Sequence, residues 1–262
     1  MPEIVFEVSE GVATITLNRP DRGNALNDEM RPLIRNAWNR VDADTAIAVA
    51  IVTGAGDRHF CTGADVARLK RESGELDPET LRLRGPGGWS SRHFGVAKPV
   101  ICAVNGVTAG GGLHFVADAD IVLATENATF TDTHVSIGQV GALENIALTH
   151  RLPLGQVLRM ALMGKFYRLG AARAYQLGLV DELFSTREAM LAAAKEMAQA
   201  MRSNSPRAMM LSKQAIWQSL ESSYSKSLEQ GWELICDQRN HPDAKEGPAA
   251  FAERRTPHWI RE

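Results

Sequence analysis

Short apolar runs rich in β-branched residues alternate with longer amphipathic stretches over the first two thirds of the chain. Residues 4–9 and 12–18 alternate apolar and polar side chains around Glu10-Gly11, which predicts a β-hairpin. Residues 46–53, 99–104 and 120–124 are almost wholly apolar, which is typical of buried strands. Because helical patterns separate these runs, the sequence predicts an α/β fold of stacked ββα units.

A first helix is expected after the hairpin. Asn27 can cap a helix that runs to about Val41, with Asp28 and Glu29 in its first turn. Pro32 lies late for that start, which predicts an irregular first turn.

The C-terminal part is mostly helical from Thr186 onward, with Pro206 at a helix start. It carries more apolar positions than a lone surface helix needs, including Ile216, Trp217, Leu220, Trp232, Leu234 and Ile235. We therefore predict a core over residues 1–200 and a helical oligomerisation region over residues 201–262.

Composition narrows the classes of function. The 262 residues carry a net charge of -2, so neither nucleic acid nor an anionic membrane is expected as a partner. No apolar run reaches the roughly 18 residues of a membrane span, and no secretory signal is expected. Cys61, Cys102 and Cys236 are odd in number and far apart, which favours reduced thiols in a cytoplasmic protein over a disulfide or metal framework.

Two buried strands run into glycine-bearing loops that lead to predicted helices. Residues 99–104 precede Gly110-Gly-Gly112, and residues 46–53 precede a loop and a helix expected from about Ala64. This construction points free backbone N–H groups and a positive helix end at one point. Two such loops can present two amides to one oxygen, as in an oxyanion hole. The glycines lack the spacing of a P-loop or a dinucleotide fingerprint, and a tight turn that merely needs small residues is the alternative.

Further motifs follow in order along nearly the whole chain. They are Asn18-Arg-Pro20, Asn24-Ala-Leu26, Phe60-Cys-Thr-Gly-Ala-Asp65, Lys98-Pro-Val-Ile-Cys-Ala-Val-Asn-Gly106, Gly178-Leu-Val-Asp181 and Lys245-Glu-Gly-Pro-Ala-Ala-Phe251. In this order and spacing the chain resembles the crotonase (enoyl-CoA hydratase/isomerase) superfamily. The resemblance implies a spiral of ββα units whose C-terminal helices build a homotrimer or homohexamer.

The resemblance also implies an acyl-CoA thioester as ligand, with no metal and no cofactor beyond the coenzyme A of that substrate. The two oxyanion-hole amides of the family correspond to Ala64 and Gly111. The residues expected at coenzyme A are Arg22, Ala25, Leu26, Gly63 and Ala64. Arg22 is a candidate phosphate contact, and a solvated arginine is the alternative.

Neighbouring residues have plainer explanations. Asp65 is expected to be a helix cap or a structural ion pair, and Cys61 to be a packed thiol and not a nucleophile. Residues 71–95 are expected to form a variable pocket wall, and the residues expected beside the acyl group are Trp89, His93, Phe94 and Leu143.

The chain departs from the family at the two catalytic positions. Hydratases of the family carry one glutamate three residues after the oxyanion glycine and a second glutamate twenty residues later. Here these positions are His114 and His134. Imidazoles act as acid or base near neutral pH without strong burial. The alternative is that both histidines fill space in an inactive acyl-CoA binder.

Glu144, ten residues after His134, is a third catalytic candidate. A carboxylate near an imidazole orients the ring and stabilises its cation. The other interpretation places Glu144 in the first turn of a helix over about 144–152, where acids are favourable anyway.

The sequence therefore predicts an enzyme of the enoyl-CoA hydratase/isomerase family that stabilises a thioester enolate. Two alternatives stay open. One is a hydrolase of the same fold, with retro-Claisen C–C cleavage or thioester cleavage, and the other is a silent acyl-CoA-binding paralogue.

Overall fold

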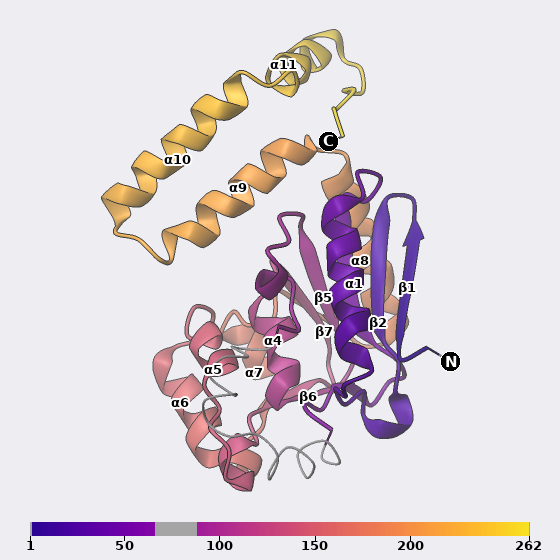
Figure 1. Cartoon of the computed structure of the whole chain (residues 1–262), viewed down its shortest axis with the longest axis vertical. Coiled ribbons are helices and arrows are strands. Elements are labelled where there is room, and N and C mark those ends of the chain that lie inside the picture. Colours follow the sequence, from indigo (N-terminus) through magenta and orange to yellow (C-terminus); the bar gives the residue numbers. More distant parts are fainter. Residues whose placement is uncertain (1, 66–87, 262) are drawn as a thin grey trace.

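Figure 1 shows the computed structural model of the chain, which describes residues 2–65 and 88–261. The helix expected from about Ala64 and most of the wall expected over residues 71–95 lie outside the described residues. The described residues up to Arg202 form an α/β core, and the last three helices extend away from it.

The larger sheet follows the order β1-β2-β3-β5-β7-β10. Its members are β1 (Ile4–Ser9), β2 (Val12–Leu17), β3 (Val49–Gly54), β5 (Val100–Val104), β7 (Ile121–Thr125) and β10 (Glu182–Phe184). β1 and β2 form the predicted antiparallel hairpin, turned by Glu10 and Gly11 with φ angles of 49° and 74°. The remaining neighbours in this sheet run parallel.

A second, smaller sheet follows the order β4-β6-β8-β9. Its members are β4 (His59–Cys61), β6 (Val107–Ala109), β8 (Thr129–Thr131) and β9 (Leu169–Gly170). In three successive pairs, the first strand joins the larger sheet and the second joins the smaller sheet; the pairs are β3 and β4, β5 and β6, and β7 and β8. The chain therefore spirals between the two sheets, which confirms the predicted ββα units.

Helices cover both faces of the larger sheet. The helices of the core are α1 (Met30–Ala43), α4 (Leu113–Ala117), α5 (Leu143–Leu148), α6 (Leu154–Met163), α7 (Ala171–Gln176) and α8 (Arg187–Arg202). Short 3-10 turns are η1 (Pro20–Arg22), η2 (Arg92–Phe94), η3 (Gly110–Gly112), η4 (His134–Ile137) and η5 (Gly164–Phe166). Helix α8 packs Met190, Ala194 and Ala198 on one face of the larger sheet, and the main core lies on the other face.

Helix α1 begins at Met30, two residues later than the expected start at Asp28. The Asn27 side chain accepts a hydrogen bond from the Met30 amide at 2.9 Å, so Asn27 caps the turn that leads into the helix. Pro32 then lies in the first turn, where an amide proton has no intrahelical acceptor, and it costs nothing there.

The last three helices, α9 (Pro206–Ser219), α10 (Tyr224–Arg239) and α11 (Asp243–Glu253), form an arm. A groove of 870 Å³ lies along α9 on its core side. The arm leaves large apolar side chains exposed, among them Trp232 at 55% and Phe251 at 86%. One contact ties the arm to η2: the Arg92 guanidinium lies 4.2 Å from the Trp217 ring centroid and 3.3 Å from a Glu221 carboxylate oxygen.

A search of the described helices for a long apolar segment finds none that could cross a membrane.

Candidate active site

The amides of Ala64 and Gly111 lie side by side. Leu26 forms a β-bridge with Ala64: the Leu26 amide donates to the Gly63 carbonyl oxygen, and the Asp65 amide donates to the Leu26 carbonyl oxygen. The Ala64 N–H therefore points away from Leu26. The position that a Cβ atom would take on Gly111 is 3.9 Å from the Ala64 nitrogen. The Gly111 N–H lies in the first turn of η3, where no intrahelical acceptor exists. Both donors are therefore available to one ligand oxygen.

Gly63 makes this approach possible. Its φ angle is +84°, a conformation that favours glycine. A Cβ atom there would lie 2.8 Å from the Ala109 carbonyl oxygen and 3.1 Å from the Gly111 nitrogen. Any side chain at Gly63 would push the two glycine-bearing loops apart.

These amides border a cavity of 250 Å³. Its described walls combine the two amide positions, apolar side chains and three titratable groups: Leu26, Ala64, Trp89, Gly111, His114, His134, Val140, Ala142, Leu143 and Glu144. All three predicted catalytic residues therefore face one space beside the predicted oxyanion hole.

His114 projects from α4 and is only 6% exposed. Its Nδ1 is enclosed and has no hydrogen-bond partner among the described residues. Its Nε2 lies 3.7 Å from a Glu144 carboxylate oxygen. Because Nδ1 is enclosed, His114 can exchange protons with a ligand only through Nε2.

His134 is held by a buried carboxylate. Its Nδ1 lies 2.6 Å from Asp132 Oδ1, and its backbone amide donates to the same oxygen at 3.0 Å. Asn145 donates to the other Asp132 oxygen at 2.5 Å. The His134 ring rests on Gly110, where a Cβ atom would lie 3.4 Å from Cε1. With Nδ1 occupied, Nε2 is the nitrogen of His134 that can serve a ligand.

Glu144 bridges the two histidines. One of its oxygens is 3.1 Å from His134 Nδ1 and the other is 3.7 Å from His114 Nε2. Glu144 is the second residue of α5 and is 4% exposed. The Glu144 carboxylate therefore contacts both imidazoles and also lies in the first turn of a helix, so both interpretations of this residue apply.

The two imidazoles have opposite pKa shifts. Burial lowers the pKa of His114, and the positive charge of His93 adds to this, although Glu144 opposes it. The hydrogen bond to Asp132 raises the pKa of His134, with a further contribution from Glu144. Burial acts against the Asp132 anion, but its bonds from His134 and Asn145 outweigh this, so the Asp132 pKa is lowered. At pH values between the two pKa values, His114 is neutral while His134 is cationic, which is the arrangement expected of a base and an acid.

The predicted coenzyme A residues line one edge of the fold. Gly63, Ala64 and Leu26 lie in the pairing just described, and Ala25 is buried beside them. Arg22 is exposed at η1 and forms no ion pair with a described residue.

Arg19, which the sequence analysis missed, fixes this edge. Its guanidinium donates to the Ala25 carbonyl oxygen at 2.5 Å and pairs with Asp65 at 2.9 Å and Glu3 at 3.1 Å. Asp65 is therefore a structural ion pair, one of the two roles expected for it.

The predicted acyl-pocket residues separate into two groups. Trp89 and Leu143 line the cavity, and the Arg31 guanidinium stacks 4.5 Å from the Trp89 ring centroid. His93 and Phe94 are not among the described walls of the cavity: Phe94 packs against the core, and His93 packs edge to face on His114.

Two groups of described side chains bring three metal-ligand atoms within 4.8 Å of one another: His93, His114 and Asp118, and Asp132, His134 and Glu144. In the first group His93 Nδ1 is bonded to Ser90 Oγ at 2.6 Å and lies 3.6 Å from Asp118. In the second, Asp132 and Glu144 already contact one nitrogen of His134. In both groups, therefore, polar atoms of the side chains already contact one another.

Cys61 is fully buried, and burial raises the pKa of its thiol to about 12. It is a packed thiol without nucleophilic character, as predicted.

The sequence profile described as enoyl-CoA hydratase/isomerase matches residues 7–262. The chain belongs to the enoyl-CoA hydratase/isomerase family. It is 33% identical to an (E)-benzylidenesuccinyl-CoA hydratase from Thauera aromatica, over 97% of each chain. It is 30% identical to a 1,2-epoxyphenylacetyl-CoA isomerase from Escherichia coli, over 99% of this chain and 98% of that one.

The crystal structure of an enoyl-CoA hydratase/isomerase from Mycobacterium paratuberculosis superposes with a TM-score of 0.89 at 37% identity, over 100% of this chain and 99% of that chain. The crotonase fold predicted from the motifs is thereby confirmed. As a member of the enoyl-CoA hydratase/isomerase family, the protein is an enzyme that acts on acyl-CoA thioesters.

Asp132 and Asn145, which support His134, were not predicted from the sequence of this member of the enoyl-CoA hydratase/isomerase family. One signal was available for Asp132, because an aspartate two residues before a turn residue often accepts its backbone amide. Nothing local marks Asn145, whose partner lies thirteen residues away.

Proposed function

We propose that the enzyme adds water across the double bond of an enoyl-CoA thioester and catalyses the reverse reaction. His114 and His134 take the place of the two glutamates of the family's hydratases. One observation carries the proposal: two imidazoles with opposite pKa shifts face one cavity beside two unpaired amides.

The first step is the attack of water. The thioester carbonyl oxygen accepts hydrogen bonds from the Ala64 and Gly111 amides, which stabilise negative charge on that oxygen. A water molecule between His114 Nε2 and the nearby Glu144 oxygen gives its proton to His114. The water oxygen bonds to Cβ, and the double-bond electrons move into the thioester as an enolate.

The second step is protonation at Cα. The enolate collapses and takes a proton from His134 Nε2, so that water has been added with no net change in protons. The enzyme now holds a proton on His114 and lacks one on His134. After the product leaves, His114 Nε2 releases its proton to water and His134 Nε2 takes a proton from water, while Glu144, which contacts both rings, stabilises whichever ring is charged. Apart from the coenzyme A of the substrate, the scheme uses no cofactor.

The decisive experiment is product analysis by mass spectrometry, with a panel of enoyl-CoA thioesters incubated in ¹⁸O-water. We expect ¹⁸O in the Cβ hydroxyl group of a product that keeps its thioester. A shifted double bond without ¹⁸O would indicate isomerisation, and ¹⁸O in a released carboxylate would indicate hydrolysis. Binding without any reaction across the panel would indicate a silent binder, and each of these three results overturns the proposal.

The pH dependence of kcat/KM should be bell-shaped. The base His114 must be neutral, so activity is lost as the pH falls through its lowered pKa. The acid His134 must be charged, so activity is lost as the pH rises through its raised pKa. The plateau therefore includes the ordinary imidazole value of about 6.5.

Asp132→Asn should shift only one side of that profile. The neutral amide no longer stabilises the His134 cation, so the alkaline limb moves to lower pH while the acid limb stays. Asp237→Asn, at a surface pair with Arg207, is the control and should leave both limbs in place. An alkaline limb unmoved in Asp132→Asn would remove His134 from the role of acid.

We also propose that the chain assembles as a homotrimer or as a dimer of trimers. Support comes from two exposed apolar surfaces on one chain. The first is on the arm and includes Trp232 and Phe251. The second lies within residues 140–166 and includes Val140, which is 85% exposed, and Phe166, which is 78% exposed.

Light scattering at micromolar concentration should give three or six times the chain mass of 28.6 kDa. Trp232→Glu should reduce this mass because it places a charge in the apolar surface. Gln230→Glu, on the same helix, is the matched control. A monomer in the unchanged protein would contradict the proposal.

A further inference from the structure

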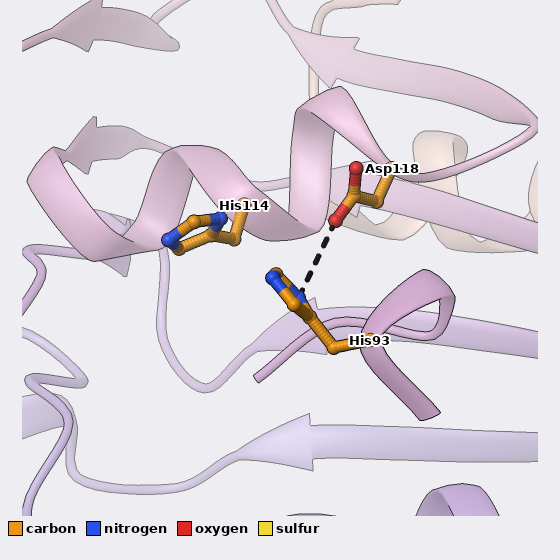
Figure 2. Close-up of side chains that lie close together, drawn as sticks. All are labelled: His93, His114 and Asp118. Atoms are coloured by element: carbon orange, nitrogen blue, oxygen red, sulfur yellow. Dashed lines mark ion pairs between the residues drawn. The ribbon is translucent and has the colours of Figure 1, made fainter. Parts of the chain in front are cut away.

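A second polar network lies beside His114, and Figure 2 shows two of its members, His93 and Asp118. It consists of Ser90, His93 and Asp118, contributed by the loop before η2, by η2 itself and by the C-terminal end of α4. Asp118 lies one helical turn after His114. None of the three lines the catalytic cavity among its described walls.

The hydrogen bonds of Ser90 fix the orientation of His93. The Ser90 hydroxyl donates to Asp118 Oδ2 in a short hydrogen bond, so its proton is committed. Its oxygen then accepts from His93 Nδ1 at 2.6 Å, and the same nitrogen is 3.6 Å from Asp118. Nδ1 of His93 therefore carries a proton.

His93 packs directly on His114. The ring centroids are 5.1 Å apart with an interplanar angle of 78°. The charged groups that face His114 are His93 from η2, Asp118 from its own helix, Glu144 from α5 and His134 from η4. The His93 side chain is 23% exposed, so the network reaches solvent.

A nucleophilic serine is not a good explanation of this network. Ser90 is 1% exposed and donates its proton to a carboxylate, whereas a nucleophile needs an accessible oxygen and a base that takes its proton.

We propose that His93, held by Ser90 and Asp118, is a positioning residue that keeps the His114 imidazole neutral and turned toward the cavity. The edge-to-face contact fixes the ring plane of His114, and the positive charge that His93 acquires opposes a second positive charge beside it. This inference rests on the proposed role of His114 as the base. It adds three residues that act through His114 and touch no substrate.

The test follows His114 in the free enzyme by NMR. The protein is labelled at histidine Cε1, the His114 signal is assigned from the spectrum of His114→Gln, and the pH is varied. We expect the titration midpoint of His114 to rise by about one unit in His93→Phe, which keeps an aromatic ring without a charge. His258→Phe, at an exposed histidine in the C-terminal segment, should leave the midpoint unchanged.

Ser90→Ala gives a second, smaller change. It removes the link between Asp118 and His93 while both remain, and the His114 midpoint should move in the same direction as in His93→Phe. This variant carries the test if His93→Phe does not fold by circular dichroism. An unchanged His114 midpoint in a folded His93→Phe or Ser90→Ala protein would overturn the proposal and leave His93 as packing alone.

Kinetics separate this inference from the proposed reaction. The acid limb of kcat/KM should move up with the midpoint, so that kcat/KM well below neutral pH falls by about tenfold relative to the plateau. A uniform loss at every pH would indicate a merely structural role. If no enoyl-CoA is hydrated but the NMR midpoint moves, the proposed reaction fails and the positioning role stands.

Discussion

Either His114→Gln or His134→Gln is expected to lower kcat by about 10²–10⁴, the usual range for loss of a general base or acid. Glutamine keeps a polar side chain in the cavity but cannot exchange a proton near neutral pH. Binding of a non-reactive acyl-CoA should persist, because the Ala64 and Gly111 amides are untouched. The measurements are steady-state kinetics and calorimetric titration with a saturated acyl-CoA.

The control for both variants is His258→Gln, whose imidazole is exposed. A further variant restores glutamate at both positions and asks whether the scaffold is otherwise a hydratase of the usual type. If turnover survives in both single glutamine variants, the histidines are fillers and Glu144 must carry the proton alone.

Gly63→Ala is expected to lower kcat by about 10²–10³, the cost of losing one oxyanion donor. The added Cβ would press on the Ala109 carbonyl and on the Gly111 amide, so the two loops must separate. Alanine at a φ of +84° would also strain the backbone and lower the free energy of unfolding by about 1–3 kcal/mol.

Gly178→Ala is the matched control for that strain. Gly178 has a φ of +83° and no atom within 4 Å of the Cβ position. Its alanine variant should therefore be destabilised in thermal unfolding yet keep its kcat. Equal losses of kcat in both variants would show that the oxyanion geometry does not depend on Gly63.

Strands β3, β5 and β7 could be predicted from sequence because each is buried on both faces and is nearly continuous in apolar residues. Strands β4, β6 and β8 could not, since three residues are too few to show a period. They form only because the preceding strand of each unit delivers them to a common second sheet. The existence of stacked units was predictable, but the sheet that carries the oxyanion loops was not.

The site divides in the same way. His114, His134 and the oxyanion pair follow from fixed spacings along motifs, so sequence placed them together. The support for His134 depends on Asp132 and Asn145, whose contact joins two elements in space. The stacking of His93 on His114 likewise joins segments twenty-one positions apart in sequence, and no local pattern marks it.

The pairing of Leu26 with Gly63 and Asp65 has a consequence for hydrogen exchange. It leaves the Ala64 amide outside the strand pairing, and the Gly111 amide outside its helix. In the free enzyme these two amides should exchange with deuterium quickly although the neighbouring Leu26 and Asp65 amides are protected. A bound thioester would slow both together, so their exchange rates report occupancy of the oxyanion hole without any chemistry.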